Sequence, residues 1–167
     1  ALHVAAAKGH LELIWLLVKL GGDPCAQTAN GSSPIHAAAG AGHAKVVREL
    51  VELGGDPRAQ TSDGVTPLFV AVAKGHVELV RLLMELVADQ PTQAANAATK
   101  LLHIAAAQGH EEVVRLLVEL GGDTRNGVTA EAVTPLHRAA GAGHANVVRL
   151  LVELGGDPRA QTAEGST

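Results

Sequence analysis

The dipeptide Gly-His recurs along the chain at nearly constant spacing, and this period constrains the fold more than any other feature. It occurs at residues 9–10, 42–43, 75–76, 109–110 and 143–144, so the steps are 33, 33, 34 and 34 residues. The string VELGGDPRAQT also occurs twice, at 51–61 and 152–162, which is three repeats apart. The chain therefore divides into five units, 1–33, 34–66, 67–100, 101–134 and 135–167. A period of about 20 to 50 residues indicates an array in which each unit stacks on its neighbours.

Each unit has the pattern of two short helices followed by a turn. A hydroxyl residue and a proline, which suit the N-cap and the first helical position, stand together at Ser33-Pro34, Thr66-Pro67 and Thr134-Pro135. An alanine-rich first helix, such as Leu68–Ala73, is expected to end at the glycine of Gly-His. A second helix with apolar residues at helical spacing ends at a glycine pair, such as Gly121-Gly122, and an Asp-Gly turn follows in other units. Helices this short are marginal alone, so they must pack on the next unit.

The stretch TPLHRAAGAGHANVVRLLVELGGDPRA, at 134–160, closely resembles the ankyrin repeat, which has a T-P-L-H-x-A signature and a period of about 33 residues. The resemblance covers essentially the whole chain. It implies an all-α solenoid of stacked helix-turn-helix units with projecting β-hairpin-like loops, in a single domain over 1–167. It also implies a non-catalytic adaptor or scaffold that binds a protein partner through hairpin tips and concave inner helices. An architectural spacer, or a regulatory arm of a larger assembly, enzyme or channel, is the alternative.

Composition narrows the class of partner and the compartment. The chain has 13 basic and 17 acidic residues and a net charge of −4, which argues against nucleic-acid binding. No apolar run reaches the roughly 20 residues of a membrane span, so we expect no membrane insertion within this segment. The single cysteine, Cys25, excludes an internal disulfide framework and favours an intracellular, cytoplasmic protein.

The nine histidines invite a metal-site interpretation, but their spacing opposes it. All of them occupy two repeat positions, which stacking would arrange in lines, whereas zinc ligands must converge on one point. The resemblance implies that they hydrogen-bond the loops. The stretch GHEEVVRL at 109–116 lacks the second histidine of a zinc protease motif, and no phosphate-binding loop is present. We therefore predict no metal, no cofactor and no enzymatic activity.

The positions through which ankyrin proteins bind partners are small and polar here, and they indicate no particular partner chemistry. Candidate contact residues at these positions are Lys8, Gln27, Thr28, Asn30, Gln60, Thr61, Ser62, Asp63, Lys74, Gln90, Gln93, Asn96, Gln108 and Arg138. Two further candidates depart from the repeat: Trp15 replaces an arginine, and Phe69 replaces a histidine. Trp15 is either a partner contact, or it packs on a preceding repeat or lies flat on its own helix.

The repeat fails at one place, residues 87–101. The glycine pair becomes Val87-Ala88, the Asp-Gly turn is lost, and Lys100-Leu101 stands where Thr-Pro is expected. Two interpretations remain open, drift in a redundant array or a reshaped loop that distinguishes a partner. The second interpretation predicts that Val87–Leu101 is also the least ordered connection in the chain.

Neither end of the array has the polar outer face of a capping repeat. The first helix opens on Ala1-Leu2, and the last unit keeps Val147, Val148, Leu150 and Leu151. We therefore expect the chain to be an excerpt of a longer array, or to have both ends covered by partners, and to be aggregation-prone when isolated.

Overall fold

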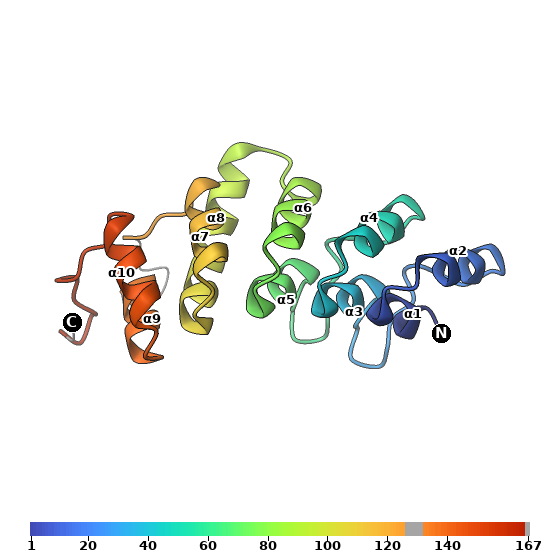
Figure 1. Cartoon of the computed structure of the whole chain (residues 1–167), viewed down its shortest axis with the longest axis horizontal. Helices are drawn as coiled ribbons and strands as arrows, with labels where there is room; N and C mark the ends of the chain where they lie inside the picture. Colours follow the sequence, from blue (N-terminus) through green and yellow to red (C-terminus); the bar gives the residue numbers. More distant parts are fainter. Residues whose placement is uncertain (126–131, 166–167) are drawn as a thin grey trace. The chain divides into compact units, whose positions relative to one another are not determined.

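The protein is described from a computed structural model, which covers residues 1–125 and 132–165. In these residues the regular structure is entirely α-helical (Figure 1). The helices are α1 (Leu2–Lys8), α2 (Leu11–Lys19), α3 (Pro34–Ala41), α4 (Ala44–Glu52), α5 (Pro67–Lys74), α6 (Val77–Val87), α7 (Pro91–Gln108), α8 (Glu111–Glu119), α9 (Pro135–Gly141) and α10 (Ala145–Glu153). The predicted helix pair is therefore present in every unit, and the all-α fold class is confirmed.

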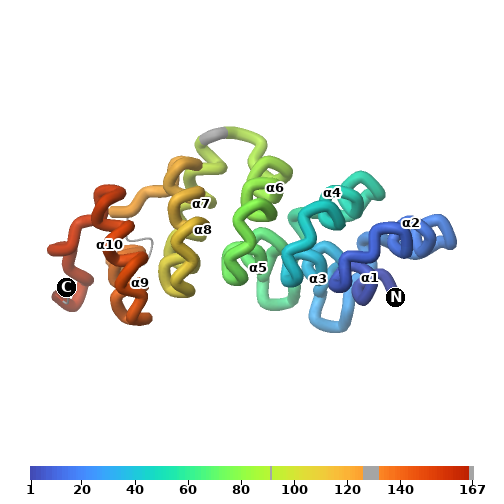
Figure 2. Tube along the Cα trace, in the orientation of Figure 1, coloured from blue at the N-terminus to red at the C-terminus, as the bar shows by residue number. Residues whose placement is uncertain are grey.

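The chain forms two compact parts, Ala1–Val87 with α1 to α6 and Ala88–Thr167 with α7 to α10. In the first part the inner helices α1, α3 and α5 pack on one another in chain order, and each also packs on its own outer helix, α2, α4 or α6 (Figures 1 and 2). In the second part α7 packs on α8 and α9, and α10 packs on α9 and α8. Within each part, packing thus follows the repeat.

Local signals place the start of α5 and the end of α3 where the sequence predicts them. Thr66 caps α5, and its Oγ1 accepts a hydrogen bond of 3.2 Å from the Phe69 amide. Pro67 occupies the first turn of that helix, where no amide donor is needed. Gly42 ends α3 in the left-handed conformation, with φ of 77°, which a glycine adopts without steric cost. The start and stop of a typical inner helix are therefore fixed by three residue types.

The core is thin and built from small aliphatic side chains. Inner helices contribute fully buried alanines, such as Ala38 and Ala39, which let neighbouring backbones approach closely. Outer helices each contribute a leucine or isoleucine with no exposed surface. These residues are Ile14, Leu50, Leu83, Leu117 and Leu151. Because each unit supplies only a few such side chains, stability depends on contacts between units.

Four histidines, His3, His36, His76 and His144, hydrogen-bond backbone carbonyls of neighbouring segments, as the ankyrin resemblance implies. His3 and His36 donate from Nε2 to the carbonyls of Ser32 (2.9 Å) and Val65 (3.0 Å), which end the following loops. Two histidines of the Gly-His pairs donate to carbonyls on the inner helix of an earlier unit. His76 donates to Gly40 (3.3 Å), and His144 donates to Ala107 (3.1 Å).

His36 is held in its neutral form by its surroundings. Its Nε2 donates to Val65, while its Nδ1 accepts from the Ser33 amide at 3.2 Å and lies 2.9 Å from Ser33 Oγ. Burial lowers the pKa of His36 below its ordinary value. The Val65 carbonyl opposes this change, and the nearby His3 lowers the pKa further. The folded protein therefore resists a proton that the unfolded chain accepts.

This difference in pKa predicts that acid destabilises the fold through His36. Its contribution is full above about pH 7 and declines as pH falls below about 6.5, because the unfolded state then binds more protons. A His36→Gln variant should lose less stability than the parent between pH 8 and pH 5 in guanidinium titrations. The exposed Gln27 supplies a control, since Gln27→Ala should follow the parent. Equal acid sensitivity of His36→Gln and the parent would contradict this assignment.

The irregular loop predicted for Val87–Leu101 is wrong over most of its length. After the short connection 88–90, α7 begins at Pro91 and continues for 18 residues to Gln108. Pro91 occupies the first helical turn, so the helix-initiating proline has moved upstream of the Lys100-Leu101 position. Lys100-Leu101 lies inside the helix and needs no cap.

Composition and tertiary contacts explain why this segment is helical. It is rich in alanine, contains no glycine, and buries Ala98 completely. The hydroxyl of Thr99 donates to the Ala95 carbonyl (2.9 Å) and accepts from the Asp123 amide (3.0 Å), which ties the extension to the loop after α8. A helical extension therefore replaces the hairpin in this unit.

Candidate interaction surface

Two hairpin-like loops project from the first part of the chain, between α2 and α3 and between α4 and α5. In each, a threonine amide bonds to a carbonyl four residues later: Thr28 to Ser32 at 2.9 Å, and Thr61 to Val65 at 3.0 Å. The turns are closed by glycines in the left-handed region, Gly31 and Gly64. Each tip is therefore held by two backbone hydrogen bonds, one across the loop and one within its turn.

The tips expose most of the candidate contact residues that the sequence predicts there. Gln27, Thr28 and Asn30 are exposed on the first tip. Gln60, Ser62 and Asp63 are exposed on the second, where Thr61 is half-buried. These are amide, hydroxyl and carboxylate groups, which suit hydrogen bonding more than apolar contact.

The two tips are joined by a hydrogen bond that sequence patterns do not reveal. The Ser62 amide donates to the Asn30 carbonyl at 3.0 Å, and the Ser62 hydroxyl lies 3.3 Å from the same oxygen. The backbones approach so closely that a Cβ on Gly31 would lie 3.0 Å from the Cα of Thr61. The tips therefore form one continuous and restrained surface.

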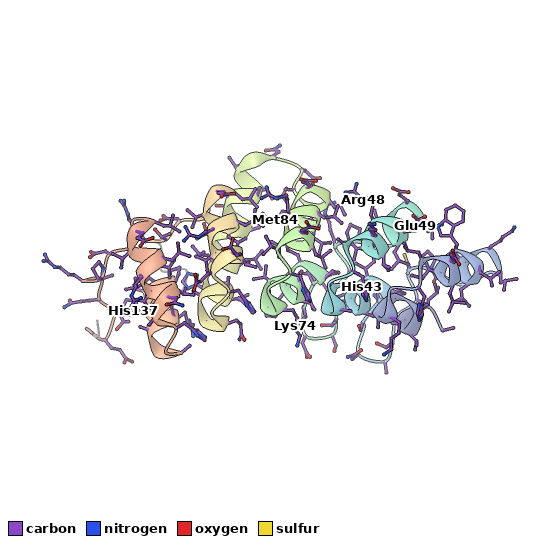
Figure 3. The ribbon with its side chains drawn as sticks, in the orientation of Figure 1. His43, Arg48, Glu49, Lys74, Met84 and His137 are labelled. Atoms are coloured by element: carbon purple, nitrogen blue, oxygen red, sulfur yellow. The ribbon has the colours of Figure 1, made fainter. Side chains whose placement is uncertain are left out.

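The inner helices present a second row of candidates. Lys8 and Lys74 are the last residues of α1 and α5, and both are exposed (Figure 3, for Lys74). They are separated by α3, whose corresponding position is Ala41. Phe69 on α5 is 38% exposed, and Val4 on α1 is 65% exposed. Val4 was not predicted from the sequence, because its repeat position is also apolar in three other units, as Ala37, Val70 and Ile104.

The second part of the chain carries the remaining candidates. Gln108 ends α7, and Arg138 lies on α9; both are exposed. Gln90, Gln93 and Asn96 are exposed as well, in the N-cap and first turns of α7 and not in an irregular loop. The Gln93 side chain accepts a bond of 3.2 Å from the Asp89 amide, which stabilises the start of the helix.

Trp15 stands apart from these rows, on the outer helix α2. It is 60% exposed, and its Nε1 donates to Glu49 Oε1 on α4 at 2.5 Å. Glu49 lies on α4 next to Arg48, which occupies the repeat position of Trp15 (Figure 3). The indole therefore reaches to the next unit, away from the hairpins and inner helices.

The described residues bring together no group of three or more side chains of the histidine, cysteine or carboxylate type at metal-binding distance. Cys25 is an exposed thiol whose Sγ lies 3.2 Å from the Gly54 carbonyl. None of the helices in the described ranges combines the length and the apolar character needed to cross a bilayer. The candidate surface described above consists mainly of exposed polar side chains on the hairpin tips and on the inner helices.

Comparison with known families matches this architecture. A family model described as "Ankyrin repeats (3 copies)" matches residues 2–94 and again residues 86–162. The two matches together include all of the helices given above. A search of curated proteins finds no match.

Proposed function

Because the chain belongs to the ankyrin repeat family, we propose that it is a non-catalytic protein-interaction module that acts as an adaptor or scaffold. Ankyrin repeats are generally protein–protein interaction modules and are typically non-catalytic. The proposed binding surface consists of the hairpin tips and the exposed side of the inner helices. The proposed setting is the cytoplasm, where the exposed thiol of Cys25 would stay reduced.

The hydrogen bond between the two tips is the observation that carries this proposal. The Ser62 amide and the Asn30 carbonyl hold two neighbouring loops in register before any partner arrives. Ordering flexible loops on binding costs about 0.5–1.5 kcal/mol for each immobilised side chain, so restrained tips lower that cost. Exposed tips that are this well restrained suit recognition by a rigid surface.

The exposed groups indicate the chemistry of the surface that would bind. Tip residues such as Gln27, Gln60 and Asn30 offer both hydrogen-bond donors and acceptors. Lys8 and Lys74 add positive charge at the ends of two inner helices. A polar partner surface carrying carboxylates opposite the inner helices fits this arrangement best.

Site-specific photocrosslinking tests the proposal. A photoreactive amino acid is introduced at Gln60 on a tip, at Lys74 on an inner helix, or at the exposed Glu85 on the outer helix α6. We expect one common protein to be crosslinked from Gln60 and Lys74 in extract of the source cell, and not from Glu85. Lys8→Glu combined with Lys74→Glu should abolish capture of that protein.

Crosslinking from Glu85 alone would move the binding surface to the outer helices. No crosslinked protein at any position would contradict the assignment as an interaction module. A matched double reversal on the outer helices, Arg48→Glu with Arg115→Glu, controls for the change in net charge and should leave capture intact.

A further inference from the structure

Two departures from the repeat, one in each of the first two units, contact each other on the outer helices. Trp15 on α2 replaces the arginine of the other four units, and Glu49 on α4 replaces the leucine of the others. In the last three units this leucine is almost completely buried, with 6% exposure at Leu82 and 2% at Leu116 and Leu150. Glu49 is half-buried instead, and its Oε1 accepts a hydrogen bond of 2.5 Å from the indole Nε1 of Trp15. An arginine and a leucine at these positions could not form this bond.

The exposure of Trp15 is a property of its repeat position. The equivalent Arg48 lies on α4, which packs on α2 and on α6, so its unit has neighbours on both sides (Figure 3). Arg48 is nevertheless exposed, as are Arg81, Arg115 and Arg149. The position therefore faces solvent on the outer surface of each unit. Trp15, which is 60% exposed, does the same whichever unit precedes α2.

The hydrogen bond holds the indole and the carboxylate in one arrangement. The indole N–H occupies one oxygen of Glu49, which leaves Oε2 available as a hydrogen-bond acceptor. Among the described residues, no lysine or arginine forms an ion pair with Glu49. Its negative charge lies beside an aromatic ring whose faces are themselves electrostatically negative. A cation is therefore the complementary ligand for this pair.

Charges of both signs surround the pair at a distance of one helical turn. The exposed Glu12 and Glu52 are balanced by the exposed Lys19 and Lys45 on the same two helices. A ligand that only neutralises charge would gain little at such an exposed and mixed surface. A ligand that lies against the ring and also donates to the carboxylate gains from the pair itself.

We propose that Trp15 and Glu49 form a docking site for an arginine side chain of a protein partner. The guanidinium group is planar and carries its N–H donors at the edge, so it can lie against the indole face while its edge donates to Glu49 Oε2. The ammonium group of a lysine has no flat face to stack in this way. Tryptophan and arginine are both enriched among the residues that dominate binding at protein interfaces. The site lies on outer helices and is independent of the tips and inner-helix lysines of the proposed function.

The fluorescence of the protein reports this site directly, because Trp15 is its single tryptophan. The full chain is titrated with a short, end-blocked peptide that alternates glycine and arginine. A matched peptide carries citrulline, the uncharged isostere of arginine, and a third carries lysine. We expect a saturable change in tryptophan emission with the arginine peptide, a weaker one with the lysine peptide and none with the citrulline peptide.

Three variants assign the binding to the pair. Glu49→Gln keeps an oxygen that can accept from the indole but removes the charge, so arginine-peptide affinity should fall by about tenfold. Glu52→Gln makes the same change in charge one turn along α4 and should leave the affinity within about twofold of the parent. Trp15→Arg restores the residue of the other units, so the fold should be retained while binding of a dye-labelled peptide, followed by anisotropy, is lost.

Each contrary outcome overturns the proposal. An unchanged emission at millimolar arginine peptide would show that the pair does not bind a guanidinium group. Equal binding of the lysine or citrulline peptide would exclude recognition of arginine. Equal weakening by Glu52→Gln and Glu49→Gln would assign the binding to the general charge of the surface. None of these results would bear on the proposed function, which is read from crosslinks at Gln60 and Lys74.

Discussion

An Ala98→Pro substitution is expected to lower the free energy of unfolding by about 3 kcal/mol or more. Ala98 lies inside α7 and is completely buried. Proline there removes a helical hydrogen bond, collides with the preceding turn, and displaces Thr99 from the Asp123 amide. Since domains are stable by about 5–15 kcal/mol in total, the loss should be evident in guanidinium unfolding followed by circular dichroism.

A proline in a true hairpin turn provides the matched control. Ala29 is the second residue of the turn closed by the Gly31 amide on the Thr28 carbonyl, a position that favours proline. Ala29→Pro should therefore change stability by less than about 1 kcal/mol. If Ala98→Pro were equally mild, the segment before Lys100 would be a loop after all.

Leu83→Ala should produce the second large effect, a loss of about 2–5 kcal/mol in unfolding free energy. Leu83 on α6 has no exposed surface and is one of the few large side chains that hold its unit. Truncation removes its buried methyl groups and leaves a cavity that short, mutually packed helices cannot fill without moving.

Leu20→Ala removes the same atoms from a side chain that is 75% exposed, so it serves as the control. Its expected cost is within about 0.5 kcal/mol. The two variants should be compared by urea unfolding at one low protein concentration. Similar midpoints for both would mean that the outer-helix leucines do not form the core of this part of the chain.

Much of the helix pattern could be read from local signals. Thr66 with Pro67 and the left-handed Gly42 fix the ends of inner helices through interactions within a few residues. Such short-range chemistry is visible in sequence because each residue acts on its immediate neighbours. Because the same residues recur in other units, the same prediction applies to their helices.

The segment before Leu101 could not be read in this way. The repeat predicts a helix start at Lys100-Leu101, where Thr-Pro is missing. The helix instead begins nine residues earlier, at Pro91, which suits its first turn. Burial of Ala98 and the bond from Asp123 to Thr99 also depend on the loop after α8, which the local sequence does not contain. The same holds for the bond between Ser62 and Asn30, which joins two backbones one repeat apart.

The four bonds from histidine Nε2 atoms to backbone carbonyls join residues between 29 and 37 positions apart, which is about one repeat. Every such bond closes a chain loop of similar and modest length, and the entropy of loop closure grows only slowly with length. The separation between contacting residues therefore stays near one repeat, however many units the array contains. Each unit can thus acquire its native contacts once the following unit has left the ribosome, without waiting for the far end of the chain.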